Sequence, residues 1–136
     1  MVLDTNIIVS ALLFSGEAAK IHEAWVDGRL HLILSEAILT EYRRVLGYRK
    51  FGLTQEEATR LLEEEVQPFG EIHVITQGVQ SWIPEDPSDD KFIALAIEAR
   101  AECLASGDSH ILSRRDSLPL SILSLSELLE KLAAEP

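Results

Sequence analysis

The chain begins with MVLDTNIIVSALLF (residues 1–14), and this stretch sets the pattern for the rest of the sequence. Residues 1–3 predict a short apolar strand, Asp4-Thr5-Asn6 a polar turn that can cap a helix, and residues 7–14 an apolar helix. A carboxylate, Asp4, therefore comes directly after a strand.

The same order of strand, turn and helix recurs along the chain. Further strands are predicted at 31–34, 72–75, 103–105 and 122–123, with helices at 17–27, 35–46, 54–67 and 89–100 and after 124. Strands that alternate with helices predict an α/β fold, a three-layer α/β/α sandwich whose mainly parallel sheet has about five strands. No repeat, low-complexity tract or linker divides the chain, so we expect residues 1–136 to form a single domain.

Composition narrows the class of protein. Hydrophobic residues make up 46% of the chain, enough for a real core, and no apolar run approaches the ~20 residues of a membrane span. No signal peptide is visible, and the single cysteine, Cys103, rules out an intrachain disulfide, so we expect a cytoplasmic protein. The net charge of −11 argues against binding nucleic acid by wholesale phosphate neutralisation. It does not exclude a nuclease, since carboxylates can recruit divalent cations that meet the phosphate.

Four carboxylates lie in four separate predicted segments. Asp4 and Asp108 follow strands directly, and in parallel sheets ligands bind beyond the carboxyl ends of the strands. Glu41 lies inside an apolar arc of its helix, and Asp90 lies on the inward stripe of the helix at 89–100. Each also has a plain structural explanation: a turn residue for Asp4 and Asp108, a stripe-edge position for Glu41, and a favourable helix dipole for Asp90.

Two further carboxylates, Asp86 and Asp89, are secondary candidates, because either can cap the helix that follows Pro87 and Ser88. Carboxylates that converge repel one another, and a hard cation with a preference for oxygen ligands relieves that repulsion. The sequence therefore favours Mg²⁺ or Mn²⁺ as a cofactor.

Taken in order, four segments resemble one known family. They are Val2-Leu3-Asp4-Thr5-Asn6, the segment 35–42 around Glu41, the segment 86–96 around Asp90, and Ala105-Ser106-Gly107-Asp108. Together they resemble the PIN domain, in an order similar to that of the VapC-type toxins and their close relatives in toxin–antitoxin systems. The resemblance covers essentially the whole chain.

This resemblance implies a metal-dependent endoribonuclease, the toxin of a toxin–antitoxin pair. It assigns Asp4, Glu41 and Asp90 to the core acidic triad and Asp108 to the fourth position, with Thr5, Asn6 and Ser106 orienting them. Ser106 stands where many members have threonine, which keeps the hydroxyl. Only three residues precede Asp4, one or two fewer than usual, so a short first strand or a trimmed start is expected. The implied partners are an RNA substrate, a small cognate antitoxin and a second copy of the chain in a homodimer.

Basic residues gather in two places, and these are the predicted RNA or partner contacts. They are Arg43, Arg44, Arg49 and Lys50 in the middle of the chain, and Arg114 and Arg115 near its end. Tyrosines interleave with the first group, a composition that suits single-stranded RNA. A solvated helix face is the alternative explanation.

Other functions remain to be weighed. A receiver-like signalling module needs a lysine after a late strand, and none of the four lysines is so placed. A haloacid-dehalogenase phosphatase would carry Asp-x-Asp at its first strand, but Asn6 stands two residues after Asp4. A catalytically silent PIN-like module that only binds RNA or protein is the third alternative, and the presence of all four carboxylates argues against it.

Overall fold

The computed structural model describes residues 1–75, 82–83 and 87–134. Asp86, one of the secondary candidates, lies outside the described residues. The described strands are β1 (Val2–Leu3), β2 (Leu32–Leu34), β3 (Gly70–Ile72), β4 (Leu104–Ala105) and β5 (Ile122–Leu123). The α-helices are α1 (Thr5–Leu13), α2 (Ala19–Val26), α3 (Glu36–Leu46), α4 (Gln55–Glu65), α5 (Asp90–Glu98), α6 (Ser109–Leu112) and α7 (Leu125–Ala134), and short 3-10 helices include Arg49–Phe51 and Pro87–Asp89.

Every described strand pair is parallel. β1 pairs with β4 and β4 with β5, while β2 and β3 form a second, two-stranded sheet. Met1 joins the two sheets, since its amino group donates to His31 O at 2.6 Å and its carbonyl accepts from Ile33 N at 2.9 Å. Met1 thus donates to one residue of the neighbouring segment and accepts from the residue two positions later, which is the bonding pattern of a parallel pair. This pairing places β1 beside β2, so the strands follow the order β3-β2-β1-β4-β5. The predicted mainly parallel arrangement is confirmed.

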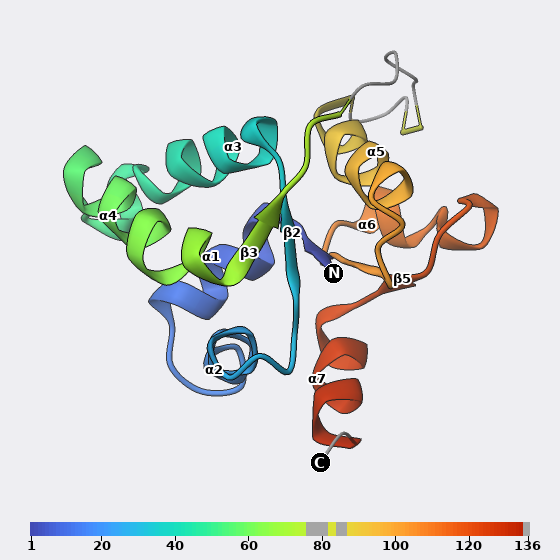
Figure 1. Cartoon of the computed structure of the whole chain (residues 1–136), viewed down its shortest axis with the longest axis horizontal. Coiled ribbons are helices and arrows are strands. Elements are labelled where there is room, and N and C mark those ends of the chain that lie inside the picture. Colours follow the sequence, from blue (N-terminus) through green and yellow to red (C-terminus); the bar gives the residue numbers. More distant parts are fainter. Residues whose placement is uncertain (76–81, 84–86, 135–136) are drawn as a thin grey trace.

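Helices cover both faces of the strands (Figure 1). α1 to α4 lie on one side of β2, and α5 to α7 lie on the other. α5 packs against β1, β2 and β4, and α1 packs against α2 and α3. The largest fully buried side chains are Trp25, Tyr42 and Phe92. Within the described ranges, no helix has the length and apolar character needed to cross a bilayer.

Short polar signals begin three of these helices, α3, α4 and α7, where the sequence predicts. Ser35 accepts from Ile38 N at the start of α3, and Thr54 and Glu57 form a complete capping box on α4. Ser124 and Glu127 exchange the same pair of bonds at α7. α1 begins two residues before the predicted start, because Asp4 itself is the cap and accepts from Ile7 N at 3.2 Å.

Two further elements differ from the prediction. The third strand is Gly70–Ile72, earlier than the predicted 72–75, because Gly70 pairs with Leu32 and the ladder ends at Ile72 opposite Leu34. The short helix α6 was not predicted from the sequence, and it exists because Asp108 caps it through His110 N and Ile111 N. The turn after β4 therefore places a carboxylate at the carboxyl end of the strand, where the start of α6 binds it.

Candidate functional site

A cleft of about 260 Å³ opens at the carboxyl ends of β1 and β4. Five separate segments of the chain contribute to its wall. The lining residues are Asp4, Thr5, Asn6, Glu41, Arg44, Val45, Tyr48, Lys50, Phe51, Ser88, Asp89, Phe92 and Asp108. Four of the residues are carboxylates, and they come from the β1–α1 turn, α3, the 3-10 helix before α5, and the β4–α6 turn.

Asp4 lies at the base of this cleft and is only 5% exposed. Its Oδ2 accepts from the Ser106 hydroxyl at 2.5 Å and from Gly107 N at 3.3 Å, while Oδ1 accepts from Ile7 N. Burial raises the pKa of the Asp4 carboxyl, these hydrogen bonds oppose the rise, and the charge of Asp108 adds to it. A cation in the cleft would offset the cost of keeping Asp4 ionised.

Glu41 reaches the cleft from the second turn of α3, with its side chain 14% exposed. Thr5 donates a hydrogen bond to its Oε2. Its Oε1 lies 2.6 Å from Lys91 Nζ and 3.8 Å from Arg44 Nη2. The predicted inward position of Glu41 is confirmed, and both of its oxygens have protein partners.

The Ser106 hydroxyl links Asp108 to Asp4. Ser106 donates to Asp4 and accepts from Asp108 N at 3.0 Å. The orienting contacts expected of Thr5 and Ser106 are therefore present, Thr5 to Glu41 and Ser106 to Asp4. Asn6 is exposed on the rim of the cleft.

Tyr42 supports the site from beneath, a contribution that the sequence prediction missed. Its side chain is fully buried and its hydroxyl donates to Leu3 O, which ties α3 to the end of β1. Burial raises the pKa of the Tyr42 phenol well above its usual value, and the charges of Asp4 and Glu41 raise it further. Its place next to Glu41, on the apolar arc of an amphipathic helix, is the sequence signal that could have predicted this role.

Asp89 and Asp90 are neighbours at the start of α5 that make different contacts. Asp90, the predicted triad member, does not line the cleft; its Oδ1 accepts from Trp82 N at 3.0 Å and from Ile83 N at 2.8 Å. Asp89, the secondary candidate, does line it. Asp89 is therefore the fourth carboxylate residue that lines the cleft, and the metal-ligand role of Asp90 stays a prediction.

One wall of the cleft combines positive charge with aromatic rings. Arg44 Cζ lies 6.0 Å from the centroid of Tyr48, and its Nη1 donates to the Tyr48 hydroxyl at 2.8 Å. Lys50 Nζ lies 5.1 Å from the centroid of Phe51. We call Arg44, Tyr48, Lys50 and Phe51 the basic-aromatic wall.

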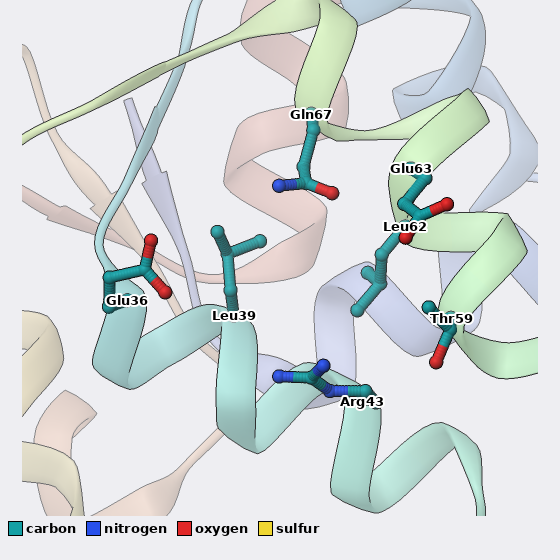
Figure 2. Close-up of a pocket in the computed structure, with 7 residues that line it drawn as sticks. All are labelled: Glu36, Leu39, Arg43, Thr59, Leu62, Glu63 and Gln67. Atoms are coloured by element: carbon teal, nitrogen blue, oxygen red, sulfur yellow. The ribbon is translucent and has the colours of Figure 1, made fainter. Parts of the chain in front are cut away.

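The other predicted basic contacts lie elsewhere. Arg43, one residue from Arg44, lines a separate hollow of about 160 Å³ between α3 and α4, together with Leu39 and Leu62 (Figure 2). Arg49, Arg114 and Arg115 are not among the cleft-lining residues, and Arg115 pairs with Glu127 at 2.6 Å. Of the six basic residues predicted as contacts, Arg44 and Lys50 line the cleft and the other four do not.

The donor set fits a hard divalent cation in kind, since four of the residues that line the cleft are aspartate or glutamate. Their side chains are not gathered around a common point: in the part of the chain that the structure describes, no three His, Cys, Asp or Glu side chains are close enough to hold a metal ion. Instead Asp4 is engaged by Ser106, Glu41 by Lys91 and Thr5, and Asp108 by the start of α6.

Comparison with known families gives one match. The family model of the PIN domain matches residues 1–110, the part of the chain that contains all of the cleft-lining residues. No curated protein and no solved structure matches the chain significantly. Because the matched region is well over half of the sequence, the chain belongs to the PIN-domain family.

Proposed function

We propose that this protein is a divalent-metal-dependent endoribonuclease. The observation that carries the proposal is the cleft itself, which acidic residues from four segments line together with the basic-aromatic wall. PIN domains are typically nucleases that use divalent metal ions, so the family supports phosphodiester hydrolysis in general. The choice of RNA and of Mg²⁺ or Mn²⁺ is our proposal.

Asp4, Glu41, Asp89 and Asp108 are the residues that would hold the cation. Bound there, Mg²⁺ or Mn²⁺ would neutralise phosphate charge and lower the pKa of a water molecule. Ser106 and Thr5 fix the carboxylates through hydrogen bonds that need no metal. The basic-aromatic wall would place the strand, with Arg44 and Lys50 on phosphates and the exposed Tyr48 ring on a base.

The test is cleavage of a labelled single-stranded RNA by the purified protein with Mn²⁺ or Mg²⁺, with and without excess EDTA. We expect cleavage that EDTA stops and that Glu41→Gln abolishes. Glu36→Gln is the matched control, because Glu36 is an exposed residue of the same helix that does not line the cleft. Cleavage that persists in EDTA would overturn the metal mechanism.

A second candidate is a PIN module that binds RNA or protein without cutting it. The pairing of Glu41 with Lys91 favours it, because the pair satisfies the carboxylate without a metal. If the wild-type protein binds RNA but cleaves it neither with Mn²⁺ nor with Mg²⁺, this alternative is selected.

The toxin role, a small cognate antitoxin, a homodimer and a cytoplasmic location are proposed from the sequence alone. For the toxin role, induced expression should arrest bacterial growth, and Glu41→Gln should relieve the arrest. A short neighbouring reading frame whose product also relieves it would identify the antitoxin.

A further inference from the structure

Lys91 places a positive charge against one of the cleft carboxylates. Its Nζ lies 2.6 Å from Glu41 Oε1 and donates to Ser88 O at 2.5 Å. The side chain is 24% exposed, and Nζ lies 5.3 Å from the centroid of Phe92. The ammonium group is therefore held between two cleft-lining residues, one on α3 and one just before α5.

This position is unusual for a lysine. Lys91 is the second residue of α5, where the positive end of the helix dipole disfavours a cation. Attraction to Glu41 offsets that cost, because both groups are largely removed from water and their charges are opposite. With Thr5 donating to Oε2, Glu41 has both oxygens occupied by protein groups.

We propose that Lys91 is an internal cation that competes with the divalent metal for Glu41. The inference rests on the proposed function, since it concerns the same cleft. When the metal is absent, Lys91 neutralises Glu41 and stabilises the closed ion pair. For Glu41 to become a metal ligand, the Lys91 ammonium group must leave Oε1, so the pair weakens metal binding and holds the empty site together.

A purely structural brace between α3 and α5 is the competing explanation. A brace and an internal cation both predict that loss of Lys91 lowers the melting temperature of the metal-free protein, because a largely buried carboxylate loses its partner. Only the internal cation predicts tighter metal binding in the same variant. The affinity for Mn²⁺ therefore distinguishes the two.

The experiment is a calorimetric titration of the RNA-free protein with Mn²⁺, combined with thermal melting in EDTA and in Mn²⁺. Lys91→Met keeps the aliphatic stem and removes the charge, while Lys91→Arg keeps the charge. Lys131→Met is the matched control, since Lys131 pairs with Glu102 at 2.8 Å and neither residue lines the cleft.

We expect Lys91→Met to bind Mn²⁺ about tenfold more tightly than wild type, because a nearby like charge has been removed. Lys91→Arg and Lys131→Met should bind as wild type does. In melting, Lys91→Met should be less stable in EDTA and gain more from Mn²⁺. Equal or weaker Mn²⁺ binding by Lys91→Met, while wild type binds Mn²⁺ and cleaves RNA, would overturn this inference alone. Failure of both wild type and Lys91→Met to bind Mn²⁺ would overturn the proposed function as well.

Discussion

Asp4 has two roles in this fold. Its Oδ1 caps α1 through Ile7 N, and its Oδ2 receives the Ser106 hydroxyl and faces the cleft. The cap fixes the carboxylate without help from a metal, so its position is set by the fold of the β1–α1 turn. Sequence alone can predict this kind of residue, because both the strand before it and the helix after it are visible in the pattern.

The sequence favours Asp90 over Asp89, because periodicity places Asp90 on the inward stripe of its helix. An inward position does not tell whether a carboxylate lines a cleft or accepts hydrogen bonds from backbone N–H groups. Asp90 is instead drawn to Trp82 N and Ile83 N, whose position depends on how the preceding segment returns to α5. The ion pair between Lys91 and Glu41 also could not be predicted from the sequence, because the two residues lie fifty positions apart in the chain.

Substitution of the two neighbours should separate their roles. Asp90→Ala leaves two backbone N–H groups without their acceptor, and the free energy of unfolding should fall by about 2–4 kcal/mol, with Asp90→Asn losing about 1 kcal/mol. Asp89→Asn should change it by less than about 0.5 kcal/mol and reduce RNA cleavage at least about a hundredfold. Urea denaturation and the cleavage assay measure both effects. Full cleavage by Asp89→Asn, together with inactive but stable Asp90→Asn, would restore the order that the sequence favoured.

Elements of this fold differ in how locally they are encoded. The capping boxes at Thr54–Glu57 and Ser124–Glu127 each span four residues, so the pattern predicts them correctly. The strands have only two or three residues each, too few for a clear period, and their bounds follow from pairing with distant partners. For this reason β3 begins at Gly70, two residues before its predicted start.

Gly70 is required by the close approach of β3 to β2. A Cβ at this position would meet Leu34 Cδ1 at 2.5 Å and Leu32 Cβ at 3.3 Å, and Leu34 is fully buried. We expect Gly70→Ala to lower the free energy of unfolding by about 1–3 kcal/mol through overpacking. Gly107→Ala is the control, because nothing lies within 4 Å of its Cβ. Equal stability of Gly70→Ala and wild type in urea would show that the strands can separate without cost.

The start of α7 should make stability sensitive to acid. The backbone N–H of Ser124, then Arg115 and the Ser124 hydroxyl, lower the pKa of Glu127 from 4.5 to about 2. Because the folded-state pKa is the lower one, the ionised cap stabilises the fold above pH 4.5, and that contribution is lost as the pH falls from about 4.5 to about 2.

Urea denaturation of wild type and Glu127→Gln between pH 7 and pH 3 measures this contribution. Wild type should be the more stable above pH 5, and the difference should shrink steadily below pH 4.5. Glu130→Gln, an exposed substitution on the same helix, is the control. A difference between wild type and Glu127→Gln that stays constant with pH would assign the effect to packing.

At the scale of the whole molecule, an acidic protein must bring a polyanion to a cluster of carboxylates. The formal net charge of −11 repels RNA at long range, so binding has to come from a local concentration of positive charge. The basic-aromatic wall is the part of the cleft that supplies it, with Arg44 and Lys50 beside two aromatic rings. Composition alone could not locate this wall, because Arg43 and Arg44 are neighbours in the sequence but line different hollows.

The wall predicts how RNA affinity responds to salt. Arg44→Ala combined with Lys50→Ala and Arg43→Ala combined with Arg49→Ala each remove two positive charges, so long-range repulsion increases equally in both. If Arg44 and Lys50 contact phosphates, their loss should weaken binding to a single-stranded RNA and reduce the slope of log affinity against log salt by about 1.4, the value for two contacts on a single strand. The Arg43 and Arg49 pair should leave that slope unchanged. Fluorescence anisotropy over a range of KCl concentrations, in EDTA to prevent cleavage, measures both. Identical slopes in the two double variants would mean that net charge governs RNA binding and that the wall does not contact the strand.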